Sequence, residues 1–408
     1  MAEPKVRFRQ KDGSSYPAWK EVTLGDIATR VTRKNSHNET DRPLTIASIE
    51  GLVDQRIYFS KTIASKDMSG YFLLKNGEFA YNKSYSVGYD YGSIKRLDKY
   101  DMGALSTLYI CFALNADENS DFYDCYFNGL RWYNQMSEIC AEGARNHGLL
   151  NVSANDFFKI RLSVPVSREE QQKIANFLAS IDEIISASGA EVQSLEMQKK
   201  AVMKKIFSQE VRFKKPDGSV FPEWQDVRFG DIFTEIVRKT SDTETYPLFS
   251  LTIENGVTAK TERYERSYLV KKAEDNYKIV PPNTFVYNPM NLRFGALAPS
   301  HEDKEICVSQ YYNVFSLNDE STLGFWENYL VSDVMLQYYF SIATGSLIEK
   351  LRVHYSSFVN IVKPIPCNEE QCLIANFLSY FDEAISAAKR ELELWRKLKK
   401  GLLQQMFV

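Results

Sequence analysis

With 408 residues, 44% of them hydrophobic and 25% charged, the chain is long enough for two or three globular domains. The formal net charge of −3 argues against strong stand-alone binding of nucleic acid, because proteins with that role are usually basic. No stretch approaches the roughly 18 uninterrupted apolar residues of a membrane span, and the first residues lack the apolar core of a secretory signal. The six cysteines lie in apolar or helical stretches, which indicates reduced, structural thiols, so we expect a cytoplasmic protein.

The predicted elements begin with an N-terminal arm over residues 1–18, and this segment recurs later in the chain. Residues 6–27 read VRFRQKDGSSYPAWKEVTLGDI and residues 211–232 read VRFKKPDGSVFPEWQDVRFGDI, with 12 of 22 positions identical at an offset of 205. A repeat this long indicates duplicated domains rather than a solenoid. In each copy the Gly-Asp-Ile segment contains a short carboxylate, at Asp26 and Asp231, and we predict both as helix N-caps.

A variable region follows each arm, at 19–164 and, after a linker arm at 209–223, at 224–365. Both regions read as α+β, with runs of β-branched and aromatic residues bounded by Gly, Asn or Pro. In the first region we predict strands at Leu44–Ile49, Phe79–Tyr81 and Leu105–Ala113 and a helix at Phe122–Met136. In the second we predict strands at Pro247–Ile253, Thr284–Tyr287 and Val308–Phe315 and a helix at Leu323–Phe340.

A long helix ends each copy, at 165–208 and 366–408. The sequence EEQQKIANFL at 169–178 returns as EEQCLIANFL at 369–378, with 8 of 10 positions identical at an offset of 200. Seam residues recur at alternating spacings of four and three, which is typical of coiled coils. In the first helix they are Ile174, Leu178, Ile181, Ile185, Ser188, Val192, Leu195, Lys199, Val202 and Ile206. Their counterparts in the second helix lie 200 residues later.

These helices would each run for about 39 residues, or about 58 Å, far beyond the ~11–12 residues usual in globular domains. We therefore predict that they pack against each other. The alternative is that each helix buries its apolar stripe on its own domain. Ser167 with Glu170, and Asn368 with Gln371, fit capping boxes at the two starts.

The chain lacks the motifs of common enzyme classes. It has no Walker A phosphate loop and no G-x-G-x-x-G after a strand. Asn288-Pro289-Met290-Asn291 resembles the Asn-Pro-Pro-Tyr motif of adenine methyltransferases, but it has neither the second proline nor the aromatic residue. The six cysteines form no CxxC pair, and the four histidines show no metal-ligand spacing. We therefore expect no catalytic residues, no cofactor and no metal.

The two EEQ-x-x-IANFL helices and the two aromatic-Pro-x-Trp arms resemble the specificity (S) subunit of type I restriction–modification systems. The likeness covers essentially the whole chain, and the segment Ile206–Phe213 followed by Pro222-x-Trp224 is a strong part of it. It implies an α+β fold in which two mixed α/β target recognition domains, at 19–164 and 224–365, are joined by two long antiparallel coiled-coil helices with a pseudo-two-fold internal repeat.

The resemblance also implies a function and partners. Each target recognition domain would read one half of a bipartite, non-palindromic site in double-stranded DNA, and the two helices would set the distance between the halves. Two methyltransferase (M) subunits and the restriction (R) subunits would join the chain. They would perform adenine methylation from S-adenosylmethionine and ATP-dependent cleavage, since the S subunit is non-catalytic.

Candidate DNA contacts are basic, amide and aromatic side chains, which bind phosphates and base edges. One matched pair of basic segments lies at 33–35 and 238–240; its alternative reading is a solvated helix end. The loops at 82–91 and 288–293 differ in length and composition, as two readers of different sequences should, although each also fits an ordinary surface loop. The predicted DNA-binding residues are Arg33, Lys34, Asn35, Lys83, Tyr85, Tyr89, Tyr91, Lys95, Arg145, Asn146, Arg238, Lys239, Asn288, Asn291, Arg293, Lys304 and Arg352.

Two other functions compete with DNA reading. A coiled-coil scaffold whose inserts bind polypeptide would share the long helices, and the net charge of −3 mildly favours it. Basic residues at matched positions in both inserts favour DNA reading. A fused methyltransferase–specificity enzyme would need a cofactor motif, which this sequence does not offer.

Overall fold

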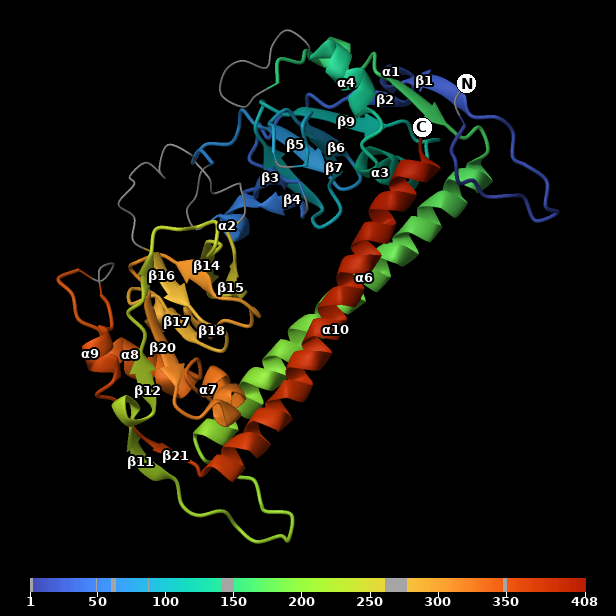
Figure 1. Ribbon diagram of the computed structural model, residues 1–408. Coiled ribbons are helices and arrows are strands. Elements are labelled where there is room, and N and C mark those ends of the chain that lie inside the picture. Colours follow the sequence, from blue (N-terminus) through green and yellow to red (C-terminus); the bar gives the residue numbers. More distant parts are fainter. Residues whose placement is uncertain are drawn as a thin grey trace. The chain divides into compact units, whose positions relative to one another are not determined.

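The computed structural model describes residues 3–48, 50–59, 64–86, 88–140, 150–260, 277–347 and 351–408. Its contacts divide the chain into two units (Figure 1). Unit 1 consists of Met1–Gly189 and Arg390–Val408, and unit 2 consists of Ala190–Lys389. Each unit therefore combines a β-rich domain with a part of each long helix.

The β-rich domain of unit 1 contains a sheet in the order β2-β9-β6-β7, a sheet in the order β4-β3-β8-β5, and the pair β1-β10. Neighbouring strands are antiparallel except for β3 and β8. The strands are β1 Lys20–Thr23, β2 Ala28–Arg30, β3 Pro43–Ala47, β4 Gly51–Asp54, β5 Phe72–Lys75, β6 Phe79–Asn82, β7 Ser93–Arg96, β8 Met102–Leu105, β9 Ile110–Leu114 and β10 Arg161–Val164. The short helices are α1 Leu24–Ile27, α2 Gln55–Tyr58, α3 Ser120–Asn128, α4 Tyr133–Ile139 and α5 Ala154–Phe157.

The β-rich domain of unit 2 repeats this plan. Its sheet β12-β20-β17-β18 matches β2-β9-β6-β7 strand for strand, and β11-β21 matches β1-β10. The strands are β11 Gln225–Arg228, β12 Phe233–Glu235, β13 Lys239–Thr240, β14 Phe249–Thr252, β15 Gly256–Ala259, β16 Tyr277–Val280, β17 Phe285–Tyr287, β18 Leu297–Pro299, β19 Ile306–Val308, β20 Asn313–Leu317 and β21 Val362–Ile365. The short helices are η1 Phe229–Asp231, η3 Leu292–Phe294, η4 Glu320–Thr322, α7 Leu323–Tyr329, α8 Asp333–Ile342 and α9 Tyr355–Phe358.

Two predicted strands are wrong in the same way, because each one spans two strands and a turn. The run Leu105–Ala113 contains the end of β8, a turn and most of β9, and the run Val308–Phe315 contains the end of β19, a turn and part of β20. Each turn begins at a serine, Ser106 or Ser309, whose backbone carbonyl and hydroxyl oxygens both accept hydrogen bonds from later residues of the turn. Each turn contains an exposed apolar or aromatic residue, Leu108 or Tyr311, followed by a half-buried residue, so its composition resembles that of a strand.

The two predicted short helices are each interrupted. The first divides into α3 and α4, and Leu130 between them has a left-handed φ of 59°. The second divides into α7 and α8, because Ser332 caps the start of α8. The predicted N-cap at Asp26 is also wrong: Thr23 is the N-cap, and the Asp26 carboxylate accepts the backbone N–H of Thr23 at 2.8 Å to complete a capping box. Asp231 lies at the end of η1 and is not its cap.

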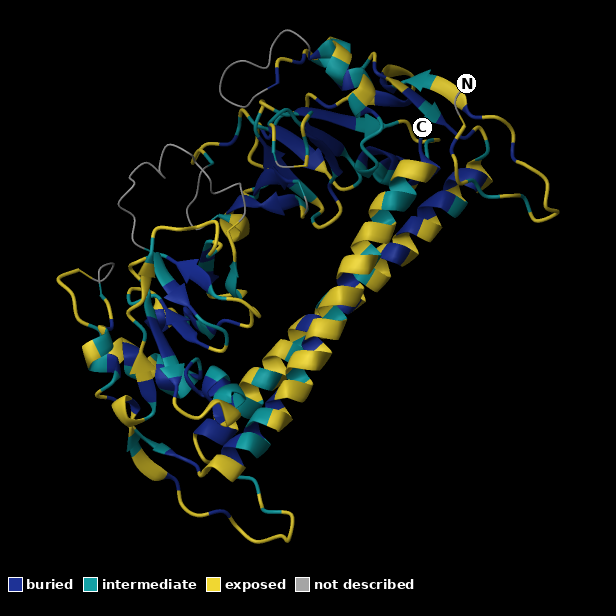
Figure 2. Ribbon diagram, in the orientation of Figure 1, coloured by how far each residue is buried: buried dark blue, intermediate teal, exposed yellow. Residues whose placement is uncertain are grey.

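The two long helices, α6 Arg168–Phe207 and α10 Asn368–Met406, confirm the predicted pair. In unit 2, Lys199 binds Asp382 at 2.6 Å and Glu196 binds Lys389 at 2.7 Å. An earlier residue of α6 thus pairs with a later residue of α10, so the two helices are antiparallel. In unit 1, Lys399 binds Asp182, and this ion pair is the equivalent of Lys199–Asp382 in the other repeat. The α+β class and the packed antiparallel helices agree with the prediction, and in Figure 2 an exposed face follows both helices.

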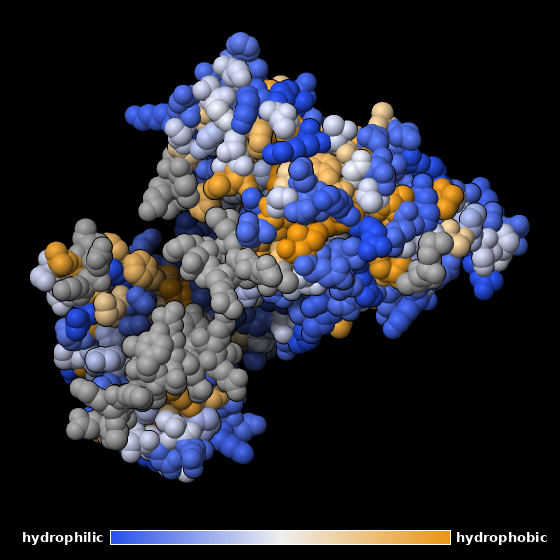
Figure 3. Space-filling model, turned by 90° about the horizontal axis from the view of Figure 1, so that it is seen from above, coloured by the Kyte–Doolittle hydropathy of each residue, from blue (hydrophilic) through white to orange (hydrophobic). Residues whose placement is uncertain are grey.

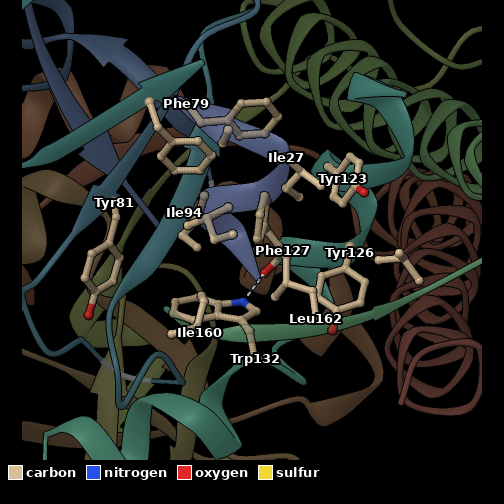
Figure 4. Close-up of a cluster of buried hydrophobic side chains, with 14 of the residues drawn as sticks. Ile27, Phe79, Tyr81, Ile94, Tyr123, Tyr126, Phe127, Trp132, Ile160 and Leu162 are labelled. Atoms are coloured by element: carbon tan, nitrogen blue, oxygen red, sulfur yellow. Dashed lines mark hydrogen bonds between the residues drawn. The ribbon is translucent and has the colours of Figure 1, made fainter. Parts of the chain in front are cut away.

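Each unit has a core rich in aromatic rings at the junction of sheet and helix. In unit 1, Phe79 stacks on Phe112 with ring centroids 5.3 Å apart, and buried Trp132 donates its indole N–H to the Phe127 carbonyl at 2.9 Å (Figure 4). This bond satisfies a polar group that would be costly to bury unpaired. The same core includes Leu178 of α6 together with residues from the end of α10, so the helices and the sheet share one apolar cluster.

The face in Figure 3 is mostly hydrophilic, with hydrophobic residues in smaller groups. None of the helices described has the length and apolar character needed to cross a membrane. Within the described ranges, no cluster of three or more histidine, cysteine, aspartate or glutamate side chains is arranged to hold a metal ion.

Candidate nucleic-acid interface

The two matched basic segments lie at equivalent places in the two units. In unit 1 the backbone N–H of Leu73 donates to the carbonyl of Arg33 at 2.9 Å. In unit 2 the backbone N–H of Ile279 donates to the carbonyl of Arg238 at 3.0 Å. Each arginine therefore lies beside an equivalent strand, β5 or β16, and the offset seen in the sequence corresponds to a shared position in space.

Both arginines are held by a carboxylate. Arg33 Nη2 donates to the two oxygens of Glu78 at 2.8 and 2.9 Å. Arg238 binds both oxygens of Glu305, and this hydrogen bonding raises the pKa of Arg238. A bidentate partner holds the planar guanidinium in one orientation. Both side chains remain exposed, so a phosphate could compete with the carboxylate for either of them.

Basic side chains gather along one sheet of unit 2, and we call Arg238, Lys239, Lys278 and Lys304 its basic edge. Lys239 and Lys278 are direct partners across β13 and β16, and Arg238 binds the residue that follows Lys304. Burial lowers the pKa of Lys278; the Glu235 carboxylate opposes this shift, and the like charge of Lys239 adds to it. Sequence reasoning missed Lys278, which no motif distinguishes from other lysines.

The basic edge of unit 1, Arg33 and Lys34, has different chemistry. Lys34 Nζ donates to the Gly70 carbonyl at 2.9 Å and lies 4.1 Å from the centre of the Phe72 ring. Phe72 forms an antiparallel β-bridge with Lys34. In unit 2 the equivalent backbone pair is Lys278 with Lys239. The frame thus repeats while the side chains on it change from one unit to the other.

The loop after β6 presents aromatic side chains unequally. Tyr85 is 59% exposed. Tyr89 is half-buried, and burial raises its pKa. Tyr91 packs against Tyr133, with ring centroids 5.4 Å apart. Among the three predicted tyrosines, Tyr85 is therefore the exposed one, with most of its surface accessible to a base or sugar.

The loops after β6 and β17 are each held by a backbone hydrogen bond at an equivalent position. The backbone N–H of Leu150 donates to the carbonyl of Lys83 at 2.8 Å, and that of Val353 donates to the carbonyl of Pro289 at 2.9 Å. Arg352 is exposed and precedes Val353, so the loop after β17 and Arg352 lie together. The side chain of Lys83 is half-buried.

Within the loop after β17, the asparagines and the arginine have different roles. Asn288 is half-buried and its side-chain oxygen accepts the backbone N–H of Met290 at 3.0 Å, whereas Asn291 is exposed. Arg293 is only 8% exposed, and its guanidinium lies 4.6 Å from the ring centre of Phe294. Arg293 is therefore part of the packing beneath the loop.

Two further predicted residues are engaged inside the protein. Asn35 is fully buried and exchanges hydrogen bonds with the backbone of Thr40 at 3.0 and 3.1 Å. Lys95 is 9% exposed and donates to Asn128 at 2.6 Å, and burial lowers its pKa. The predicted residues Arg145 and Asn146 lie outside the described residues. Among the described candidates, the exposed ones are Arg33, Tyr85, Arg238, Lys239, Asn291, Lys304 and Arg352.

Each arm is fastened to the start of a long helix by a buried carboxylate. In unit 1, Glu170 is fully buried and accepts from Arg7 Nε at 2.7 Å and from the indole N–H of Trp19 at 3.3 Å. Unit 2 repeats this joint with Arg212, Trp224 and Glu370. We call the two sets the arm joints.

The arm joints were not predicted from the sequence. The sequence predicts a capping box for Ser167 and Glu170. The backbone N–H of Glu170 does donate to the Ser167 hydroxyl at 3.4 Å, but the Glu170 carboxylate binds Arg7 in the arm joint. At the second helix Asn368 is itself the first helical residue, and its side chain donates to Asp319. The sequence signal for the arm joints is that the same three residue types, Arg, Trp and Glu, occupy the matched positions of both repeats.

Comparison with known proteins gives consistent matches. A family profile, the type I restriction modification DNA specificity domain, matches residues 222–394. The Methanocaldococcus jannaschii protein named "Putative type I restriction enzyme MjaX specificity subunit" is 25% identical over 312 residues, which cover 71% of this chain and 68% of that protein.

Solved structures share the fold. A chain from a type I R-M system superposes with a TM-score of 0.56 at 15% identity, covering 96% of this chain and 98% of that one. The type I restriction–modification S subunit from M. genitalium superposes with a TM-score of 0.53 at 13% identity, covering 100% and 99%. These likenesses extend over both units.

Proposed function

Since this chain belongs to the family of type I restriction–modification DNA specificity subunits, we propose that its two β-rich domains read the two halves of a bipartite, non-palindromic DNA site. The family is non-catalytic. In the proposed complex, two methyltransferase subunits and the restriction subunits bind this chain in the cytoplasm and perform the chemistry. The domains would correspond to residues 19–164 and 224–365, each with its arm and spacer helix.

The observation that carries this proposal is a repeated frame with unlike surfaces. Arg33 and Arg238 occupy equivalent places, where basic side chains suit phosphate contacts that are independent of sequence. The neighbouring positions differ, with Phe72 in one unit and Lys278 in the other. Two readers built this way would lie in the same register on DNA and select different bases.

The long helices supply surface for partner subunits. Outside the seam, Met197 is 67% exposed, Tyr380 is 69% exposed and Leu394 is 66% exposed. These exposed apolar side chains would be available to a protein partner. The mild negative charge of the chain fits a complex in which partners share the phosphate contacts.

Replacing Lys239 with alanine should weaken DNA binding by the complex with methyltransferase subunits at every site tested, by a similar factor. A lost phosphate contact should also reduce the slope of log affinity against log salt by about 1. Binding titrations across a salt series measure both quantities. Lys397→Ala, which removes a lysine 69% exposed on α10, is the control and should leave the slope unchanged. An unchanged slope for Lys239→Ala would remove this residue from the interface.

Lengthening both helices should lengthen the unread gap of the DNA site. Seven residues inserted after Gly189 and seven before Arg390 preserve the 3.5-residue seam and add about 10 Å, close to three base pairs. Methylation mapping should recover both half-sites with a gap wider by about three base pairs. Insertion into α6 alone is the control, because it moves Lys199 out of register with Asp382 and so disrupts the pairing of the two helices. A gap that stays constant in the doubly extended chain would contradict the spacer role.

A further inference from the structure

Each unit holds an asparagine and a lysine–aspartate pair of the long helices in equivalent places. Unit 1 adds the Asp124 carboxylate, 3.4 Å from Asn128 Nδ2, where unit 2 has Gly324. Asn128 donates its side-chain amide to the carbonyl of Asp124 at 2.9 Å, and Asn328 donates to the carbonyl of Gly324 at 2.8 Å. The ion pair Lys399–Asp182 in unit 1 corresponds to Lys199–Asp382 in unit 2 at an offset of 200. The two units can therefore be compared at one strand position, which Lys95 holds in unit 1 and Ala298 holds in unit 2.

That position is occupied by lysine in unit 1 and alanine in unit 2. Lys95 on β7 pairs with Ala80 on β6, and Ala298 on β18 pairs with Val286 on β17. These strands correspond in the sheet order of the two domains. Lys95 extends its ammonium to the Oδ1 of Asn128 at 2.6 Å, so unit 1 carries its own cation at this place.

Unit 2 has a cavity of about 500 Å³ at the corresponding place. Ala298, Asn328, Lys199 and Asp382 all line it. Ala298 is the counterpart of Lys95, and Asn328 is the counterpart of Asn128. The pair Lys199–Asp382 is the counterpart of Lys399–Asp182. The cavity falls within the range of about 300–1,000 Å³ that small-molecule sites occupy. Alanine at this position leaves room beside Asn328 that a lysine side chain would partly fill.

The lining of the cavity suits an amine with an apolar stem. Among the described residues that line it, Glu254, Glu327 and Asp382 carry carboxylates, against one lysine and His301. His301 lies 2.9 Å from Glu327, and that contact raises its pKa. The walls include Leu297, Val331 and Leu336. Carboxylates suit an ammonium group, and the aliphatic wall suits methylene groups.

We propose that this cavity binds a primary alkylammonium ion, with the ammonium at Asn328 as that of Lys95 is at Asn128. The ion is either a free diamine or a lysine side chain of a partner subunit, since the two present the same chemistry. The bound ion would link the strand that holds Ala298 to Asn328 on α7, as Lys95 links β7 to Asn128 on α3 in unit 1.

The test uses the full chain with putrescine as the probe, titrated by calorimetry at fixed ionic strength. Wild type should show one saturable site. Ala298→Lys supplies an internal ammonium and Ala298→Met occupies the space beside Asn328 without charge, and each should weaken putrescine binding at least tenfold. In unit 1, Lys95→Ala should open a second site, whereas Lys95→Met should not. The methionine variants separate filling of the cavity from charge repulsion, and circular dichroism of each variant checks its fold.

The methyltransferase subunit distinguishes the two sources of the amine. If binding of the subunit displaces putrescine, the natural occupant is a lysine side chain of that partner; if putrescine stays bound, the occupant is a free amine. The proposal is overturned if wild type shows no saturable binding, or if both folded Ala298 variants bind putrescine as wild type does. Thermal unfolding provides a second readout, because putrescine should raise the melting temperature of wild type and not that of Ala298→Met.

Discussion

Replacing Glu170 with alanine should destabilise unit 1 by about 3–5 kcal/mol, the range seen when one partner of a buried ion pair is removed. The carboxylate is fully buried and accepts from Arg7 Nε at 2.7 Å, Arg7 Nη2 at 3.0 Å and Trp19 Nε1 at 3.3 Å. Without it, the buried indole N–H loses its acceptor, and the largely enclosed guanidinium keeps only Glu3 and the Pro17 carbonyl. The arm should then detach from the start of α6.

Urea unfolding followed by tryptophan fluorescence measures this effect, because Trp19 belongs to the joint itself. Glu169→Ala is the matched control: Glu169 is adjacent, exposed, and pairs with Lys173 at 3.3 Å, so its loss should cost less than about 0.5 kcal/mol. Glu370→Ala should produce the equivalent loss in unit 2. Equal stability of Glu170→Ala and Glu169→Ala would show that the joint contributes no net stability.

Replacing Phe407 with alanine should cost unit 1 about 3–5 kcal/mol, the usual range for deleting a buried phenylalanine ring. Phe407 is fully buried, with its ring centroid 5.4 Å from that of Tyr126 and 5.8 Å from that of Phe122. Its counterpart Phe207 packs against Tyr329 at 5.3 Å in unit 2. The ring therefore anchors the end of α10 to the domain formed by the first part of the chain.

Thermal unfolding of the Phe407→Ala chain should show an earlier transition for unit 1, with the transition of unit 2 little changed. Leu394→Ala on the same helix is the control, because Leu394 is 66% exposed and its truncation leaves no buried cavity. A single transition shifted equally by both variants would contradict the assignment of Phe407 to the core of unit 1.

The helix pair was predictable because its evidence is local and periodic. Residues spaced alternately by four and three mark a seam without knowledge of the partner, and a second copy at a constant offset identified that partner. The turns at Ser106 and Ser309 were missed because hydrogen bonds to serine make the turn while the neighbouring residues remain strand-like.

The candidate site was predicted less completely, because exposure depends on residues distant in sequence. Lys95 and Arg293 carry charges suited to DNA, yet Asn128 and the rings of Phe294 and Phe340 hold them inside the protein. No pattern near either residue reports those contacts. The alignment of Arg33 with Arg238 succeeded because the duplicated frame supplied the structural comparison within one sequence.

The division of the chain between the units has a consequence for synthesis. Unit 2 is one continuous stretch, Ala190–Lys389, whereas unit 1 needs Arg390–Val408 in addition to Met1–Gly189. Met406 and Phe407 are among the core residues of unit 1. On the ribosome, domains generally fold in order from the N-terminus. Unit 1 cannot follow that rule, because its core is incomplete until Met406 and Phe407 have been made, after every residue of unit 2.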